Sequence, residues 1–247
     1  MKRFLSFLIP VSLSLGATAQ VHTVPFKSSS AHQINISLNN SDVEIVGTND
    51  DNVTITASNF VESDQTLLGD NATGVKVYIS GNVLDIKKVS ESPASYVIKV
   101  PKKNSLFFQE EFRAPKLIRI SNISGSVVAK SWVSRIILKD IAGPVQASSM
   151  VSDISVEYSS LSQIKPSTIE SAGRVVEVIL PPDSKVTANL IVTAGNVESE
   201  FDLGSQNQEL LRKVGGTRKI EAKLNGGGPS LNITAHTIIF KKTKSSL

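Results

Sequence analysis

The chain has no cysteine among its 247 residues. This absence excludes disulfide bonds, thiolate metal sites and a lipid attached to an N-terminal cysteine. Aromatic residues make up only 5% of the sequence, and 26 basic residues face 22 acidic ones. That excess is small and dispersed, so it argues against nucleic acid or an anionic membrane surface as the partner. The length is sufficient to bury a sizeable core in one domain.

The N-terminus has the three-part layout of a cleavable secretory signal. A basic pair precedes the apolar stretch Phe4–Leu15, and small residues at A-x-A spacing end the segment at Ala19–Gln20. The apolar stretch is about a dozen residues long, short of the roughly 20 that a membrane-spanning helix needs. We therefore expect a signal peptide, residues 1–20, and one exported domain, residues 21–247, without a transmembrane anchor. Its location would be the periplasm, the cell surface or the medium.

Short alternating runs of β-branched residues dominate the rest of the chain. Examples are Gln33–Leu38, Val43–Ile45, Val53–Ala57, Val75–Ile79 and Tyr96–Val100. Period-two alternation bounded by Asn, Asp, Gly and Ser predicts β-strands. The one candidate helix is Gln206–Val214, a short surface helix in which Ser205 and Gln208 have capping-box spacing. The sequence thus predicts an all-β protein.

A repeat runs through the sequence from residue 117 onward. Its turn motif, a small residue followed by a variable one and then Val or Ile, recurs every nine residues at Gly125, Ser134, Gly143 and Ser152. At twice that spacing, eighteen residues, the same or similar residue types recur, most clearly Ile118, Ile136 and Ile154. A hairpin meander has no reason to restore residue type at every second strand. The pattern therefore predicts a parallel β-solenoid with rungs of about eighteen residues, right-handed by default.

The repeat also predicts which way side chains point. In this register Leu138 faces inward, while Lys139 faces outward between Ser121 and Glu157 of the neighbouring rungs. A Lys–Glu neighbour pair of this kind belongs to a solvated face rather than to a site. The glycines before each strand are expected to allow sharp turns, often through positive φ.

Motifs for catalysis or metal binding are weak. His22, His32 and His236 are isolated in sequence, and no G-x-S-x-G motif is present. Asn49–Asn52 lacks the glycine and distal glutamate of a calcium loop, so it predicts a turn. Gly226–Gly228 precedes a proline rather than the Lys of a phosphate loop, and it also predicts a turn. We expect no enzyme activity, no metal and no cofactor.

Four aromatic residues are the candidates for contact with a ligand or partner: Phe107, Phe108, Phe112 and Trp132. The run from Phe107 to Phe112 forms either a protruding binding loop or, the favoured reading, a strand edge or a cap on the open end of the coil. Trp132 lies in a turn, where it either stacks on a sugar ring or packs as a half-buried indole.

Several segments, in their order, resemble a bacterial β-strand-repeat family called putative adhesin, an exported domain of unknown function. They are Leu117–Val127, Leu138–Val145, Val178–Pro181, Ser184–Val192, Thr193–Phe201, Asn225–Pro229 and Leu231–Ile233, within roughly residues 30–242. The chain departs from the family pattern at Ser134 and Ser152, which replace a turn glycine, and at Ala235 and His236, which replace an Asn-Gly. The resemblance implies wider turns there. The family has no established catalytic residues, so none is carried over.

Together, the residues and the resemblance imply a non-catalytic, adhesin-like binding or scaffolding module of the cell envelope. Its partner would be a protein or glycan of the envelope or surface. Two alternatives stay open: a carbohydrate-active enzyme on a β-helix, and an envelope-sensing partner of a membrane regulator. The enzyme needs acidic or basic side chains that converge on neighbouring rungs. A concave charged groove would favour the enzyme, and a flat polar wall would favour scaffolding.

Overall fold

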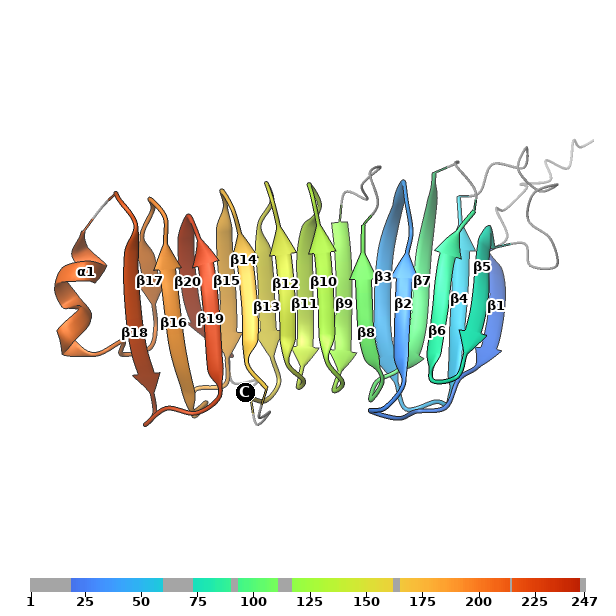
Figure 1. Cartoon of the computed structure of the whole chain (residues 1–247), viewed down its shortest axis with the longest axis horizontal. Coiled ribbons are helices and arrows are strands. Elements are labelled where there is room, and N and C mark those ends of the chain that lie inside the picture. The colour runs from blue at the N-terminus through green and yellow to red at the C-terminus, as the bar shows by residue number, and fades with distance from the viewer. Residues whose placement is uncertain are drawn as a thin grey trace, which may run out of the picture.

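The computed structural model describes residues 19–59, 73–89, 93–110, 117–161, 165–213 and 215–244. The expected signal peptide therefore lies almost wholly outside the described residues. The described chain forms two ten-stranded sheets that face each other along the long axis of the molecule (Figure 1). The predicted all-β class is confirmed.

The strands of the two sheets are given in spatial order, so that neighbours are hydrogen-bonded. Sheet A contains β1 (Gln20–Pro25), β4 (Asn52–Ser58), β7 (Ala94–Pro101), β3 (Ser41–Thr48), β9 (Leu117–Ile123), β11 (Arg135–Ile141), β13 (Ile154–Tyr158), β15 (Val175–Leu180), β20 (Thr237–Lys242) and β17 (Val197–Ser199). Sheet B contains β18 (Arg218–Leu224), β16 (Val186–Val192), β19 (Ser230–Ala235), β14 (Ser167–Ser171), β12 (Val145–Ser149), β10 (Val127–Ser131), β8 (Ser105–Gln109), β2 (Gln33–Ser37), β6 (Val83–Lys88) and β5 (Val75–Ser80).

In the middle of the molecule the chain alternates between the two sheets. Strands β9, β11 and β13 pair in parallel in sheet A, and β10 and β12 do so in sheet B. Ile136 pairs with Ile118 on one side and with Ile154 on the other. This parallel, eighteen-residue register is the predicted one. The offset widens in the next step, where Ile154 pairs with Val176.

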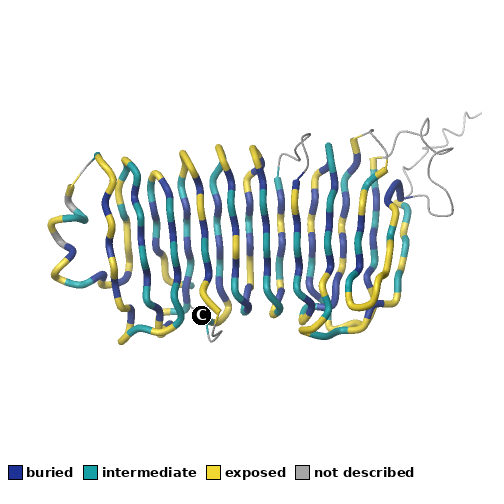
Figure 2. Tube along the Cα trace, in the orientation of Figure 1, coloured by how far each residue is buried: buried dark blue, intermediate teal, exposed yellow. Residues whose placement is uncertain are grey.

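Burial alternates along nearly every strand, because successive side chains of a strand point to opposite faces of its sheet (Figure 2). Leu138 is fully buried and Lys139 is exposed, as predicted. The predicted pairing of Lys139 with Glu157 is wrong. The ladder shifts after Leu138, where Asp140 adopts a φ of 55°, and resumes only at Ile141.

Both ends of the sheets are interleaved. Strand β19 lies between β14 and β16, and β20 lies between β15 and β17, so the last strands of the chain are interior ones. At the other end, β7 lies between β3 and β4. Figure 1 accordingly shows the C-terminus beneath the strands rather than at an end of the molecule. Three of the four edge strands, β1, β5 and β18, pair antiparallel with their neighbours.

The turn glycines of the repeat serve close approach rather than positive φ. A Cβ at Gly143 would lie 1.9 Å from the backbone oxygen of Gly125, and one at Gly125 would lie 2.1 Å from that of Asn104. Neither of these glycines has a positive φ, whereas Gly81, in the turn between β5 and β6, does. The stacked turns therefore require glycine because neighbouring backbones nearly touch there.

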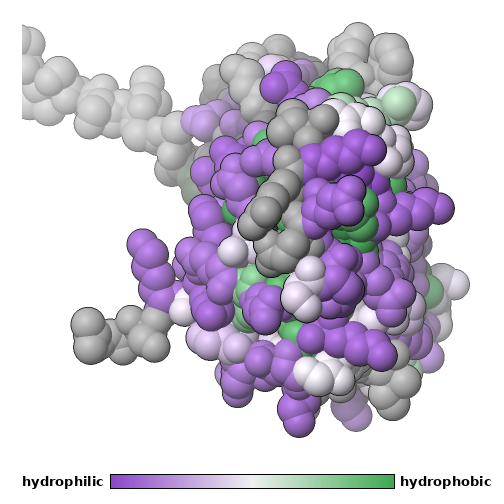
Figure 3. Space-filling model, turned by 90° about the vertical axis from the view of Figure 1, so that its left-hand side faces the viewer, coloured by the Kyte–Doolittle hydropathy of each residue, from purple (hydrophilic) through white to green (hydrophobic). Residues whose placement is uncertain are grey.

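A short helical segment lies at the end of the molecule beside β18. It consists of η2 (Ser205–Asn207) and α1 (Gln208–Arg212), which confirms a short helix. The segment begins one residue before the predicted Gln206 and ends at Arg212, and the predicted end, Val214, lies outside the described residues. The predicted capping box is absent, since the N-cap of α1 is Asn207, without a side-chain cap hydrogen bond. This end is largely hydrophilic (Figure 3). Among the described residues no helix is long and apolar enough to cross a membrane.

Candidate ligand-binding site

The structure separates the four aromatic residues that the sequence singled out. Phe107 lies on the outer face of sheet B, whereas Phe108 is fully buried in the core. The expectation that Phe108 contacts a ligand is therefore wrong, because alternation along β8 turns it inward. Phe112 lies outside the described residues. Trp132 is 61% exposed in the turn between β10 and β11, so it is not a half-buried packing residue.

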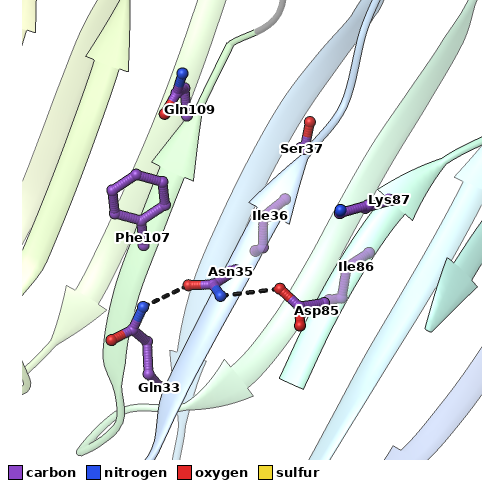
Figure 4. Close-up of a pocket in the computed structure, with 9 residues that line it drawn as sticks. All are labelled: Gln33, Asn35, Ile36, Ser37, Asp85, Ile86, Lys87, Phe107 and Gln109. Atoms are coloured by element: carbon purple, nitrogen blue, oxygen red, sulfur yellow. Dashed lines mark hydrogen bonds between the residues drawn. The ribbon is translucent and has the colours of Figure 1, made fainter. Parts of the chain in front are cut away.

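Phe107 stands beside a hollow of about 340 Å³ on the outer face of sheet B. Strands β2, β6 and β8 form its floor (Figure 4). The lining residues are Gln33, Asn35, Ile36, Ser37, Asp85, Ile86, Lys87, Phe107 and Gln109. The two isoleucines face the core, so the groups presented to solvent are three amides, a hydroxyl, a carboxylate, an ammonium and one aromatic ring.

A hydrogen-bonded ladder crosses the hollow. The amide nitrogen of Gln33 donates to Asn35 Oδ1 at 2.6 Å, and Asn35 Nδ2 donates to Asp85 Oδ1 at 2.9 Å (Figure 4). The second bond forms because Asn35 and Asp85 pair in register on neighbouring parallel strands. The ladder fixes the orientation of the Asn35 amide before any ligand arrives, and such preorganisation favours binding.

The ladder belongs to a longer row of side chains that runs across the strands. Asn35 pairs with Phe107 of β8 on one side, and Asp85 pairs with Tyr78 of β5 on the other. Tyr78 is 53% exposed. Lys130 of β10 holds its Nζ atom 5.9 Å from the centre of the Phe107 ring. Two aromatic rings thus flank an amide and a carboxylate on four adjacent strands.

The titratable groups described do not assemble a catalytic set at this hollow. Its lining contains one carboxylate, Asp85, and one ammonium, Lys87. His32, immediately before β2, is hydrogen-bonded to the Lys27 carbonyl oxygen at 2.8 Å and packs beside the ring of Phe26. Within the described part of the chain, no three His, Asp or Glu side chains gather closely enough to hold a metal ion. The hollow can bind by hydrogen bonding and stacking.

Trp132 belongs to a different surface, formed by the tips of two stacked turns. Trp132 and Val133 in one turn, and Met150 and Val151 in the next, are each half exposed or more. Serine hydroxyls brace these turns: Ser131 Oγ accepts from the Ser134 amide at 2.7 Å, and Ser149 Oγ accepts from the Ser152 amide at 3.2 Å. Ser134 and Ser152, which depart from the resembling family, therefore sit in serine-capped turns.

The sequence pointed to Phe107 but missed the polar part of the hollow. Alternation in Gln33–Leu38 could have identified Gln33 and Asn35 as outward-facing. It could not have paired them with Asp85, which lies 50 residues after Asn35 in the chain. In the calcium candidate Asn49–Asn52, residues 49–51 form the bend between β3 and β4, and Asn52 begins β4. The carboxylate of Asp51 accepts from the Ser28 amide at 2.8 Å.

No protein-family model and no curated protein matches the chain. Solved structures do. A "putative cell adhesion protein" from Clostridium sporogenes is 13% identical, with 92% of this chain and 100% of that chain covered and a TM-score of 0.45. A "putative adhesin" from Bacteroides fragilis is 10% identical, with 91% and 96% covered and a TM-score of 0.37.

Three of the matching structures are of bacterial proteins named as adhesins or cell adhesion proteins. A "putative lipid binding protein" from Parabacteroides distasonis is 14% identical, with 92% and 97% covered and a TM-score of 0.31. Likenesses this distant assign no ligand to the chain.

Proposed function

We propose that the protein is an exported, non-catalytic binding module of the cell envelope, adhesin-like in the sense of the resembling family. Its middle strands would be the rungs of a right-handed β-solenoid of about eighteen residues per rung. The sheets serve as a rigid frame, and the outer face of sheet B makes the contact. Export rests on the secretory pattern of the N-terminus.

The observation that carries the proposal is the ladder of Gln33, Asn35 and Asp85 beside Phe107. Side chains held on sheet strands keep a fixed geometry, which a binding face needs and a loop provides less well. A glycosidase on the same face would need two carboxyl groups flanking the scissile bond. The lining of the hollow supplies only Asp85, so binding is favoured over turnover.

Two measurements test export and binding. The full chain, expressed in a bacterium, should be recovered outside the cytoplasm with its mature N-terminus near Ala19–Gln20. The purified mature protein should then cosediment with the insoluble envelope fraction. Phe107→Ala should reduce the sedimented fraction, whereas Gln146→Ala, at an exposed position of the same row two strands away, should not. A cytoplasmic, uncleaved chain, or equal loss in both variants, would contradict the proposal.

A separate screen tests the absence of turnover. We expect no hydrolysis or elimination of polysaccharides and no cleavage of model esters, with or without calcium. Turnover that persists in highly purified protein and disappears in Asp85→Asn would overturn the non-catalytic part of the proposal.

A further inference from the structure

The row through the hollow has the chemistry that sugar rings require. Tyr78, Asp85, Asn35 and Phe107 lie in register on four adjacent strands. At a strand spacing of ~4.8 Å, the two aromatic positions are about 14 Å apart. Pyranose rings present C–H groups to the negative face of an aromatic ring and hydroxyl groups to amides and carboxylates. The row offers stacking at its two ends and hydrogen bonding between them.

A second row, of lysines, runs beside the first. Lys76 and Lys87 pair with each other across β5 and β6, and Lys130 pairs with Gln109 of β8. The first row is called the aromatic row. Each lysine lies two residues along its strand from a residue of the aromatic row, which is about 7 Å away. For Lys130 that residue is on β10, onto which the aromatic row continues. The Lys87 side chain points from β6 toward β2 (Figure 4). The ammonium groups therefore border the side of the aromatic row.

The lysine pairing is unfavourable for the sheet by itself. Like charges directly opposite each other on neighbouring strands destabilise a sheet, and Lys76 and Lys87 occupy such a pair. Among the described residues, the ion pair is between Lys241 and Glu177, far along sheet A. No described carboxylate therefore forms an ion pair with a lysine of this row in sheet B. The Asp85 carboxylate is held in the first row by the hydrogen bond from Asn35 rather than turned to a lysine. An anionic ligand would relieve the repulsion.

We propose that the two rows bind an acidic glycan, a chain of pyranose units that carry carboxylate groups. The sugar rings lie across β5, β6, β2 and β8, between Tyr78 and Phe107, and their carboxylates meet Lys76, Lys87 and Lys130. The inference rests on the proposed function and names its ligand class. An exported protein meets glycans of the envelope and the medium, which favours this ligand over a single-stranded nucleic acid with similar chemistry.

Calorimetry on residues 21–247 tests the ligand class directly. The probes are oligogalacturonates of two to six units and neutral gluco-oligosaccharides of the same lengths. We expect measurable binding of the acidic series and binding of the neutral series weaker by about tenfold or more. Affinity for the acidic series should fall as salt rises, because exposed charges are screened.

Single substitutions separate the two rows. Phe107→Ala should weaken binding of both series by about tenfold, since it removes a stacking platform. Lys87→Ala should reduce the preference for the acidic series and flatten its salt dependence, while neutral binding stays unchanged. Lys219→Ala is the matched control: Lys219 is exposed on β18, in the same row at the far end of sheet B. Thermal melts verify that each variant is folded.

Three outcomes would overturn the inference: no binding of the acidic series at millimolar concentration, equal effects of Lys87→Ala and Lys219→Ala, or tighter binding of a single-stranded oligonucleotide of equal charge. The envelope test distinguishes this failure from that of the proposed function. If Phe107→Ala still abolishes cosedimentation while no glycan binds, the module binds a ligand of another class through the same face.

Discussion

The central strands and the C-terminal strands reach the same parallel arrangement by different routes. In the centre, Ile136 pairs with Ile118 and Ile154, so each step of sheet A uses the next rung along the chain. In the C-terminal part, Val176 of β15 pairs with Ile238 of β20, and the chain between them forms β16, β17, α1, β18 and β19 first. In the centre, each strand pairs with the strand of the next rung. In the C-terminal part, the last strands of the chain insert between strands that precede them in the sequence.

A repeat in the sequence therefore predicts the pairing only of those strands that are neighbours both in the sheet and in successive rungs of the chain. Pairing of β19 and β20 with earlier strands closes a long loop before any stabilising contact forms. This loop closure costs conformational entropy and slows folding. As a result, the sheets finish at this end of the molecule in the earlier strands β17 and β18, while the later strands β20 and β19 lie inside them.

Removal of the inserted strands should have the largest effect. A chain ending at Pro229 loses β19 and β20, whose buried side chains include Leu231, Ile233, Ile238 and Phe240. We expect no cooperative thermal transition, because two sheets would be split at interior positions. A chain ending at Lys244 is the control and should melt like the full domain.

Hydrogen exchange tests the same point in the intact protein. The amides of β20 should be protected as strongly as those of β11, despite their position near the C-terminus. Rapid exchange in β20, together with a cooperative melt of the shortened chain, would show that the inserted strands are peripheral.

Leu138→Asp should destabilise the central region by several kcal/mol, since it buries an unpaired carboxylate. Lys139→Asp, one residue further and exposed, should cost well under 1 kcal/mol. Chemical denaturation of the two variants gives both values. A larger loss for Lys139→Asp would mean that the inward and outward faces of β11 are assigned the wrong way round, and equal losses would mean that the two positions do not differ in burial.

Glycine substitutions should distinguish the stacked turns of the centre from the wider turn that follows. Gly143→Ala forces a Cβ to within 1.9 Å of the Gly125 oxygen, and we expect a loss of about 1–3 kcal/mol. At Gly173, before β15, an added Cβ meets nothing within 4 Å, so Ala should be neutral or stabilising by up to about 1 kcal/mol. Similar losses at both positions would argue against close stacking as the cause.

The ion pair between inserted and central strands should have the smallest effect. Lys241 Nζ on β20 lies 2.5 Å from Glu177 Oε1 on β15. Burial by itself raises the pKa of the Glu177 carboxyl, but hydrogen bonds from Lys241 and Ser155 outweigh it, so the pKa lies below its ordinary value of 4.5. A lowered pKa in the folded state stabilises the protein above pH 4.5, and this contribution is lost as the pH falls through the folded pKa.

The measurement is the pH dependence of thermal stability. Below pH 4.5 the melting temperature of the wild type should approach that of Glu177→Gln, which lacks the titrating carboxyl. A gap that widens as the pH falls would contradict the assigned direction of the pKa shift.

The sequence was sufficient to predict which side chains of the candidate site face outward, but not which strands lie next to one another there. Alternation turns Phe107 and Asn35 outward, and the same rule, applied to β8, turns Phe108 into the core. What alternation cannot supply is the neighbour of each strand. Strand β2 lies between β6 and β8, and these follow it in the chain after intervals of different length.

The sequence by itself determined the all-β class, the alternation of faces and the eighteen-residue register of Ile118, Ile136 and Ile154. These are local properties, set by side-chain periodicity and by neighbouring rungs of equal length. Only the tertiary structure decided that β19 and β20 enter between earlier strands, that Tyr78, Asp85, Asn35 and Phe107 share one row, and that the lysines border it. Pairing between distant strands depends on which edges and core faces fit once the sheets exist, and no window of sequence contains that information.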